Sequence, residues 1–443
     1  MFALLLACVT SDAAPAAAVP LEVAWSHQRT PLTTITPSGR TWRRGIIHVH
    51  SYLSHDACDD HELPDAQCFA DFRSGLCDAA IDVAYITDHP STAAEHSFDE
   101  LLLAEPEDEV VDGVANRLTC ESGHDVLTLP GIEDELMPVG LLRHVADSQE
   151  ENERLYNNSD AETIAAEIAA GALVLQAHTE GKSLSELQDR QANGLAGVEM
   201  FNLHAMVDPN KREEDLGLDR FGYLEAIAPF MSGETAAEPD LAFLSFYEEQ
   251  GVSLERWDAL NTTKFTVGTA GTDAHQNTIP LAMNDGERGD SYRRMMSWFS
   301  NVLLVDSESP ADHMVALASG RMFIAFETLG TPSNFSVTYT GVDTTLEMGG
   351  EASVGGTLAV SCPVLSVDSP QTGTTPPEIA VAVFKDGDIW QSTCGEWSVL
   401  EPGVYRVRAD IVPHHLAGFL DNQAETLVHT YPWLYSNALR ITD

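Results

Sequence analysis

The sequence carries little positive charge. Its 443 residues include 23 Lys and Arg against 69 Asp and Glu, which gives a formal net charge of −46 at pH 7. Lysine occurs only at Lys182, Lys211, Lys264 and Lys385. Because no basic patch interrupts this acidic composition, the surface is expected to repel nucleic acid and anionic lipid headgroups. We therefore expect no nucleic-acid partner.

Long hydrophobic runs are also missing. None approaches the roughly 18 apolar residues that a membrane-spanning helix needs, which excludes a multi-span transporter or channel. The short apolar start ends in Leu6-Ala7-Cys8, which is similar to a bacterial lipobox, and residues 11–20 would serve as a tether. This predicts a signal and tether over residues 1–41 of a bacterial lipoprotein in the cell envelope or outside the cell, with membrane contact only through a lipid anchor at Cys8. No basic residue precedes the apolar run, and the alternative is a frayed N-terminus of a cytoplasmic protein.

The cysteines favour disulfides. Apart from Cys8 there are six, an even number, and without a Cys-x-x-Cys pair a zinc knuckle is the weaker interpretation. Paired cysteines are typical of oxidising compartments, which agrees with export. The spacings leave open the connectivity of Cys58, Cys68, Cys77, Cys120, Cys362 and Cys394.

Between residues 42 and 330, short apolar or β-branched runs alternate with helical stretches. This alternation is typical of βαβ units, and seven such units favour a barrel over an open sheet. The charged stretch 206–238 is interpreted as an excursion between units, either a lid or a surface loop. The expected strands cover residues 45–49, 81–86, 126–131, 172–176, 197–201, 265–269 and 302–305, with helices such as 161–170 and 183–190 between some of them.

After about Gly330 the pattern changes to Thr-, Ser-, Val- and Gly-rich alternation with turn signals, and helical periodicity disappears. Residues 331–443 are therefore predicted to form a separate antiparallel β-sandwich, with Cys362 and Cys394 as a possible staple. Since none of the ligand motifs lies in this region, we expect it to be non-catalytic and separable.

Histidines and acids cluster at the carboxyl ends of the expected strands. His48 and His50 end the first strand, and residues two apart on a strand point to one face, so both imidazoles can face one ion. One such pair is weak evidence, but five strand ends with metal-binding residue types are hard to explain structurally. The candidate ligands are His48, His50, His89, Glu133, His178, Asp273 and His275.

Imidazole and carboxylate together suit Zn²⁺, Mn²⁺ or Fe²⁺, whereas calcium prefers oxygen ligands. The set is larger than one tetrahedral ion needs, so we expect two or three divalent metal ions that share a bridging carboxylate, for which Glu133 is the natural candidate. Such a cluster gives a metal-bound hydroxide near neutral pH and holds both the attacking and the leaving oxygen of an ester. The implied reaction is hydrolysis.

These ordered motifs resemble the PHP (polymerase and histidinol phosphatase) family over roughly Arg44 to Ala325. They are His48-x-His50-Ser51, Thr87-Asp88-His89, Gly131-x-Glu133, Ala177-His178 and Thr272-Asp273-Ala274-His275. The resemblance implies an α/β fold, a distorted (βα)7 barrel that holds two or three metals, and phosphoesterase activity. The segments 285–288, 320–321 and 432–437 resemble the carbaryl hydrolase-like branch, whose members carry a C-terminal β domain.

Two positions depart from the family pattern. The family usually reads His-x-His-Thr-x-x-Ser-Asp-Gly, whereas here Ser54 is followed by His55 and then Asp56. Register favours His55 as a ligand and chemistry favours Asp56, so both stay open. The usual His-Pro is His178-Thr179, which loses a proline but keeps the imidazole.

Weaker candidates lie around this set. Glu199, Asn202 and His204 end the fifth strand, and His204 is a candidate general acid or a residue that hydrogen-bonds at the rim. Asp88 is expected to orient His89 or a water molecule. Arg288, with Arg293 and Arg294, is the candidate phosphate-binding group, although arginines in so acidic a stretch are usually solvated or paired.

Three functions compete. The preferred one is an exported, metal-dependent phosphoesterase that hydrolyses small phosphodiesters or phosphomonoesters. The second is a carboxylic or carbamate ester hydrolase, which the scarcity of basic charge mildly favours. The third is a surface-anchored binding protein with the barrel as scaffold, and the full ligand set argues against it.

Overall fold

The computed structural model describes residues 24–231, 237–369, 372 and 375–443. The predicted lipid-anchor residue Cys8 and the tether at residues 11–20 lie outside the described residues. Within the described ranges, no helix is both long and apolar enough to cross a membrane.

The first part of the chain forms a large mixed sheet. Its parallel ladders follow the order β5, β2, β1, β9, β8, β7, and β6 joins β7 antiparallel. The strands are β1 (Thr41–Val49), β2 (Val83–Ile86), β5 (Asp125–Pro130), β6 (Leu136–Val139), β7 (Leu173–Gln176), β8 (Gly197–Asn202) and β9 (Val267–Ala274), with β3 (Glu109–Val111) and β4 (Ala115–Thr119) antiparallel beyond β5.

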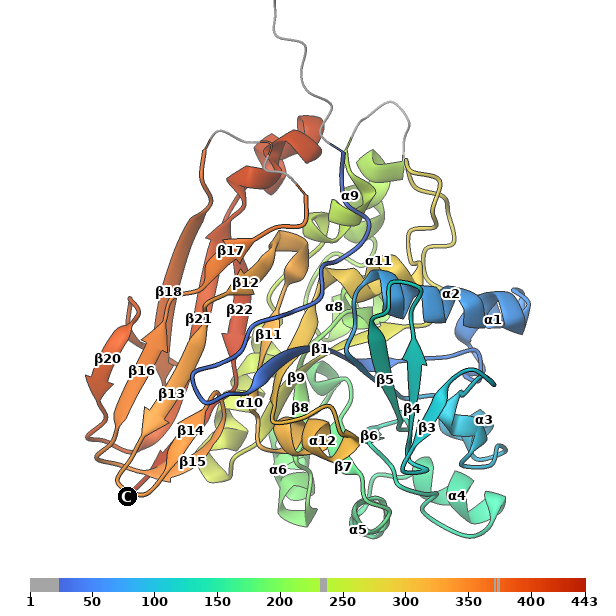
Figure 1. Cartoon of the computed structure of the whole chain (residues 1–443), viewed down its shortest axis with the longest axis horizontal. Helices are drawn as coiled ribbons and strands as arrows, with labels where there is room; N and C mark the ends of the chain where they lie inside the picture. The colour runs from blue at the N-terminus through green and yellow to red at the C-terminus, as the bar shows by residue number, and fades with distance from the viewer. Residues whose placement is uncertain (1–23, 232–236, 370–371, 373–374) are drawn as a thin grey trace, which may run out of the picture.

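Helices connect and cover these strands (Figure 1). They are α1 (Ala57–His61), α2 (Asp65–Asp78), α3 (Pro90–Ala93), α4 (Gln149–Tyr156), α5 (Ala161–Ala169), α6 (Leu184–Asn193), α7 (His204–Val207), α8 (Pro209–Glu214), α9 (Gly222–Met231), α10 (Gly251–Thr263), α11 (Tyr292–Trp298) and α12 (Pro310–Ala318). Three of these helices begin at a capping side chain that accepts a hydrogen bond from a backbone N–H group of the first turn. The capping residues are Ser148 for α4, Asp160 for α5 and Ser183 for α6.

The predicted α/β class is confirmed, but the described residues form a large mixed sheet and not the predicted closed (βα)7 barrel, and two strands differ from the prediction. Residues 302–305 lie in β10 (Ser300–Val305), which pairs antiparallel with the first half of β1 and is not a seventh parallel strand. The strand β6 was not predicted, because Pro138 lacks an N–H and made the run look unlike a strand. β5 and β6 meet at an isolated bridge between Gly131 and Val139, so no continuous ladder links these two strands.

The C-terminal region is rich in antiparallel strands, as predicted (Figure 1, orange to red). One sheet has the order β14, β13, β16, β20, and β12 pairs with β17. The strands are β12 (Thr331–Ser333), β13 (Ser336–Thr340), β14 (Thr345–Glu347), β15 (Gly350–Ser353), β16 (Thr357–Ser361), β17 (Val364–Ser366), β18 (Glu378–Lys385), β19 (Asp388–Gln391), β20 (Gly395–Ser398), β21 (Gly403–Val412), β22 (Tyr431–Ser436) and β23 (Leu439–Thr442), and the short helix α13 (Ala424–Leu427) precedes β22.

The large sheet continues into this C-terminal region. β10 pairs with β11 (Met322–Ala325), β11 pairs with β22, and β22 pairs with β21. Hydrogen-bonded ladders therefore cross the boundary that the sequence predicts at Gly330. The division into residues 42–330 and 331–443 stays a prediction, and a protein truncated at Gly330 would expose the edge of β11.

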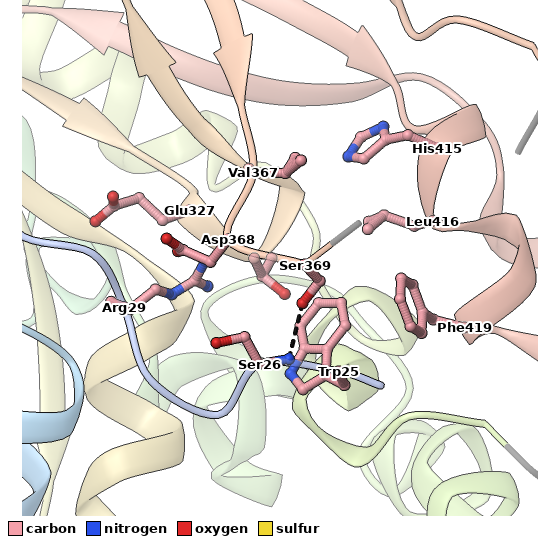
Figure 2. Close-up of a pocket in the computed structure, with 12 residues that line it drawn as sticks. Trp25, Ser26, Arg29, Glu327, Val367, Asp368, Ser369, His415, Leu416 and Phe419 are labelled. Atoms are coloured by element: carbon pink, nitrogen blue, oxygen red, sulfur yellow. Dashed lines mark hydrogen bonds and ion pairs between the residues drawn. The ribbon is translucent and has the colours of Figure 1, made fainter. Parts of the chain in front are cut away.

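The N-terminal segment also joins the two parts. Ser26 N donates to Ser369 Oγ over 2.9 Å, and Thr30 N donates to Asp368 Oδ1 over 3.0 Å. Figure 2 shows the small cavity beneath this segment, where Trp25 lies near the C-terminal region. These contacts fix the C-terminal strands against the large sheet at a second place.

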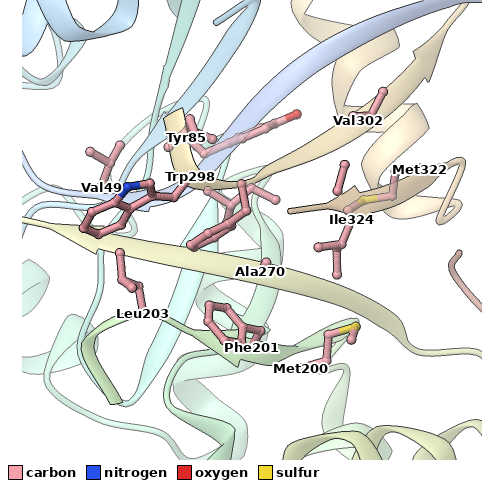
Figure 3. Packing of buried hydrophobic residues seen from close by; sticks show 14 of the residues in the cluster. Val49, Tyr85, Met200, Phe201, Leu203, Ala270, Trp298, Val302, Met322 and Ile324 are labelled. Atoms are coloured by element: carbon pink, nitrogen blue, oxygen red, sulfur yellow. The ribbon is translucent and has the colours of Figure 1, made fainter. Parts of the chain in front are cut away.

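Aromatic packing gives the large sheet a dense interior. Phe201 on β8 meets the rings of Phe299 and Phe326 edge-on, with centroids 5.2 and 5.0 Å apart. Figure 3 shows Phe201 among side chains from other strands, including Val49 and Ala270. A core of this kind is close-packed, so it holds the strand ends in fixed relative positions.

All six expected cysteines form disulfides. The pairs are Cys58–Cys68, Cys77–Cys120 and Cys362–Cys394. The last pair lies within the C-terminal region, as the sequence suggested. Three disulfides indicate an oxidising compartment.

Glu167 on α5 is a buried acid whose titration should weaken the fold at high pH. Both carboxyl oxygens lack a hydrogen-bond partner, and burial raises its pKa to about 9 from an ordinary value of 4.5. Between these values the unfolded chain is ionised while the folded chain keeps the proton, so stability is lost as pH rises through this window.

We expect Glu167→Gln to reduce the decrease in the free energy of unfolding with rising pH by up to about 1.4 kcal/mol per pH unit. Denaturant unfolding at pH 5, 7 and 9 measures the effect, with exposed Glu153→Gln on α4 as the control. Identical pH slopes for the wild type and Glu167→Gln would contradict it.

Candidate metal centre

Seven side chains from five strand ends converge on one place. His48 and His50 end β1, His89 follows β2, Glu133 follows β5, His178 follows β7, and Asp273 and His275 end β9. Three of them have left-handed backbone conformations, with φ of 63° at His48, 50° at His178 and 48° at Asp273. Such φ values are uncommon for residues other than glycine and are concentrated at functional sites.

Asp273 and Glu133 lie between the imidazoles. Asp273 Oδ1 is 3.2 Å from His48 Nε2 and 3.4 Å from His50 Nε2, and its Oδ2 is 3.5 Å from His178 Nε2. Glu133 Oε1 is 3.5 Å from His178 Nε2, and Oε2 is 4.0 Å from His48 Nε2. Each carboxylate therefore faces more than one imidazole, as a bridging ligand would.

A second group lies on the other side of His50. The rings of His50 and His275 are stacked with centroids 3.7 Å apart, and His89 lies 4.7 Å from His50. Asp56 Oδ2 is 3.4 Å from His275 Nε2 and 3.5 Å from His89 Nε2. Ligand atoms of His50, His89 and His275 lie within 4.8 Å of one another, close enough to hold one ion.

The two open positions, His55 and Asp56, differ in placement. Asp56 contacts two imidazoles of the second group, whereas His55 is exposed, with its ring 4.9 Å from that of His89. His55, Asp56 and His89 also form a group whose ligand atoms are within 4.8 Å. The structure thus brings Asp56 into the cluster and leaves His55 at its solvent edge.

The donor set fits divalent metal ions. The Nε2 atoms of His48, His50 and His275 are buried and have no hydrogen-bond partner. The opposite nitrogens are engaged, because Nδ1 lies 2.7 Å from Glu199 Oε1 in His48, 3.0 Å from Ser54 Oγ in His50 and 3.0 Å from the Asp273 carbonyl in His275. Rings held through Nδ1 with a free Nε2 are typical of metal ligands.

The electrostatics of the cluster keep its carboxylates ionised. Burial opposes ionisation of Glu133, but hydrogen bonding to His89 and the neighbouring imidazoles outweigh it and lower its pKa to about 2. Burial likewise opposes ionisation of Asp273, and interactions with His48 and His204 bring its pKa well below the usual range. Ionised carboxylates are the form that binds a metal ion.

Two of the weaker candidates take different positions. His204 Nδ1 is 2.8 Å from Asp273 Oδ2, so this ring lies beside the cluster, and its side chain is 35% exposed. The Asp88 carboxylate instead accepts hydrogen bonds from Ser51 N and Ser51 Oγ, both over 2.7 Å. Asp88 therefore fixes the loop after His50, and its expected role in orienting His89 or a water molecule stays a prediction.

The arginines proposed for phosphate binding are paired with acids. Arg288 donates to both oxygens of Asp59 over 2.8 Å and to Asp290 over 2.6 Å. Arg293 and Arg294 bind Asp240, and Arg294 also donates to Asp285. These pairs give the three arginines a structural role, and substrate binding by Arg288 stays a prediction.

Two buried acids support the ligands from outside the cluster. Glu199, fully buried, contacts His48 Nδ1 and accepts a hydrogen bond from His178 N over 2.9 Å. Glu180, also buried, has Oε1 3.3 Å from His178 Nδ1. The sequence singled out Glu199 by its strand end but not Glu180, whose position two residues after His178 was the available signal.

Sequence comparison finds no protein family and no curated protein that matches the chain. Among solved structures, the chain is similar to a two-domain protein from Bacteroides vulgatus that contains a predicted PHP-like metal-dependent phosphoesterase. The two share 11% sequence identity, with 91% of this chain and 98% of the other covered, at a TM-score of 0.38. A score of this size does not establish a common fold, so the function proposed below rests on the side chains of the site.

Proposed function

We propose that the protein is a metal-dependent hydrolase, specifically a phosphoesterase that cleaves small phosphodiesters or phosphomonoesters. The observation that carries the proposal is the convergence of five histidines, Glu133 and Asp273 with imidazole nitrogens left unpartnered at the centre. The ordered motifs that resemble the PHP family, and the segments that resemble its carbaryl hydrolase-like branch, support the same conclusion.

Different side chains of the site would bind the metal ions and donate a proton. His48, His178 and Asp273 would hold one Zn²⁺, Mn²⁺ or Fe²⁺ ion, and His50, His89 and His275 with Asp56 a second, and Glu133 faces both groups. When bound, two or three such ions supply Lewis acidity and an activated water for ester cleavage. His204 lies beside Asp273 at the exposed rim, where it is placed to give a proton to the leaving oxygen.

A carboxylic or carbamate ester hydrolase is the second candidate. The pairing of Arg288, Arg293 and Arg294 with acids favours it, because a phosphate loses its expected cationic partners. A surface-anchored binding protein remains the third proposal and has least support, since a scaffold has no need for this ligand set.

The location also belongs to the proposal. The disulfides support an extracytoplasmic enzyme. Anchoring through a lipid on Cys8 is proposed from the sequence around that residue, and a small-molecule ester is the proposed partner.

The experiment is hydrolysis of a panel of phosphate and carboxylate esters by native, chelator-stripped and metal-restored protein. We expect cleavage of phosphate esters that stops on stripping and returns with Zn²⁺, Mn²⁺ or Fe²⁺. Activity that survives complete removal of metal would contradict the proposal, and cleavage of carboxylate esters alone would favour the second candidate.

A further inference from the structure

Two short consecutive helices, α7 and α8, carry two basic side chains to one rim of the metal centre. His204 begins α7, and Asp208 precedes α8, where its Oδ1 accepts hydrogen bonds from Asn210 N and Lys211 N over 2.9 and 2.8 Å. Asp208 Oδ2 also lies 3.7 Å from His204 Nε2. The same carboxylate therefore fixes the first turn that carries Lys211 and lies beside the ring of His204.

Lys211 lies close to the cluster. Its Nζ is 4.0 Å from Glu180 Oε1, and this oxygen is 3.3 Å from Nδ1 of His178, a candidate ligand. The ammonium group is thus separated from a cluster imidazole by one buried carboxylate.

This rim is one of two accessible sides of the cluster, the other being the side of His89 and Asp56, whose side chains are 21% and 31% exposed. The side chains of His178, Lys211 and His204 are 18%, 29% and 35% exposed, whereas those of His48 and His50 are fully buried. A substrate that reaches the ligands from solvent on this side would pass Lys211.

The ammonium group of Lys211 also has hydrogen-bond donors that its contact with Glu180 does not use, whereas other cations near the site donate to acids. At 4.0 Å its contact with Glu180 is longer than a hydrogen bond, and an ammonium group has three donors. By contrast, Lys182 Nζ is 3.0 Å from Glu135, and Arg288 is bound on both sides by acids.

We propose that Lys211 binds the charged oxygens of a phosphate group at the metal centre, so that the site selects anionic phosphate esters over uncharged esters. This inference rests on the proposed function and narrows it, because Lys211 supplies the cation that the paired arginines do not. An ammonium group is a suitable point charge for phosphate.

The test compares Lys211→Ala with Lys182→Ala, which removes the same charge from an ion pair with Glu135. For Lys211→Ala we expect the KM for p-nitrophenyl phosphate and the inhibition constant of inorganic phosphate to rise about 10-fold, which corresponds to about 1.4 kcal/mol. Its kcat and metal content should change less than twofold, Lys211→Arg should restore most of the loss, and Lys182→Ala should resemble the wild type.

Two results would overturn the inference: phosphate constants unchanged in Lys211→Ala, or an equal rise in Lys182→Ala, which would indicate only a general charge effect. If the wild type cleaves no phosphate ester, the proposed phosphoesterase fails. Calorimetric binding of inorganic phosphate to metal-loaded wild type and Lys211→Ala then still tests Lys211, and equal affinities would refute its role.

Discussion

Glu133→Gln is expected to lose turnover and to bind less metal. Gln keeps the shape of the side chain but removes the negative charge that lies between the imidazoles of His89 and His178. A neutral amide oxygen is a poorer ligand for a divalent ion than a carboxylate. Removal of a residue that only supports a metal ligand lowers metal affinity or activity about 10- to 100-fold. The loss of metal affinity and turnover in Glu133→Gln should be larger than this.

The matched control is Glu135→Gln. Glu135 lies two residues away, and its side chain is 46% exposed and paired with Lys182 and Arg190. Its replacement should leave metal content and kcat near wild-type values. If Glu133→Gln keeps full activity and full metal content, Glu133 is not a ligand and the bridging role is wrong.

Glu199→Gln should weaken metal binding, although Glu199 supports the ligands and is not expected to be a ligand itself. Both oxygens of Glu199 are used as acceptors, from His48 Nδ1 on one side and from His178 N and Asn202 Nδ2 on the other. The amide of Gln turns one acceptor into a donor, so either His48 or the His178 loop loses its partner. We expect metal affinity to fall about 10- to 100-fold.

Competition with a chromophoric chelator measures that affinity, and thermal unfolding of the metal-free protein shows whether the variant still folds. A variant that unfolds is replaced in the test by Asn202→Ala, which removes one hydrogen bond to Glu199 and should weaken binding less. Wild-type affinity in folded Glu199→Gln would contradict the positioning role.

Much of the site was predictable because its residues follow strand ends. Parallel strands bring their carboxyl ends to one edge, which gathers these residues. The strand period of two does not by itself place His48 and His50 together, because His48 has φ 63° and the register of β1 shifts between Ile47 and Val49. The choice between His55 and Asp56 could not be made this way, because it depends on the left-handed turn that follows Asp56, where Cys58 has φ 61°. The sequence around Cys58 does not predict that turn.

Contacts between distant segments were beyond sequence reasoning. Lys211 reaches Glu180 only because α8 lies beside the loop after β7. The pairing of β11 with β22 was hidden because a buried apolar run looks the same whether its neighbour is parallel or antiparallel. The partner of Arg288 could not be identified because Asp59 is 229 positions away in the sequence.

The most direct test of the metal centre is elemental analysis of the wild-type protein, purified without chelator and loaded with Zn²⁺, Mn²⁺ or Fe²⁺. We expect two or three ions per chain, and fewer in the double variant Glu133→Gln/Asp273→Asn. A folded wild-type protein that binds no divalent ion would contradict the account.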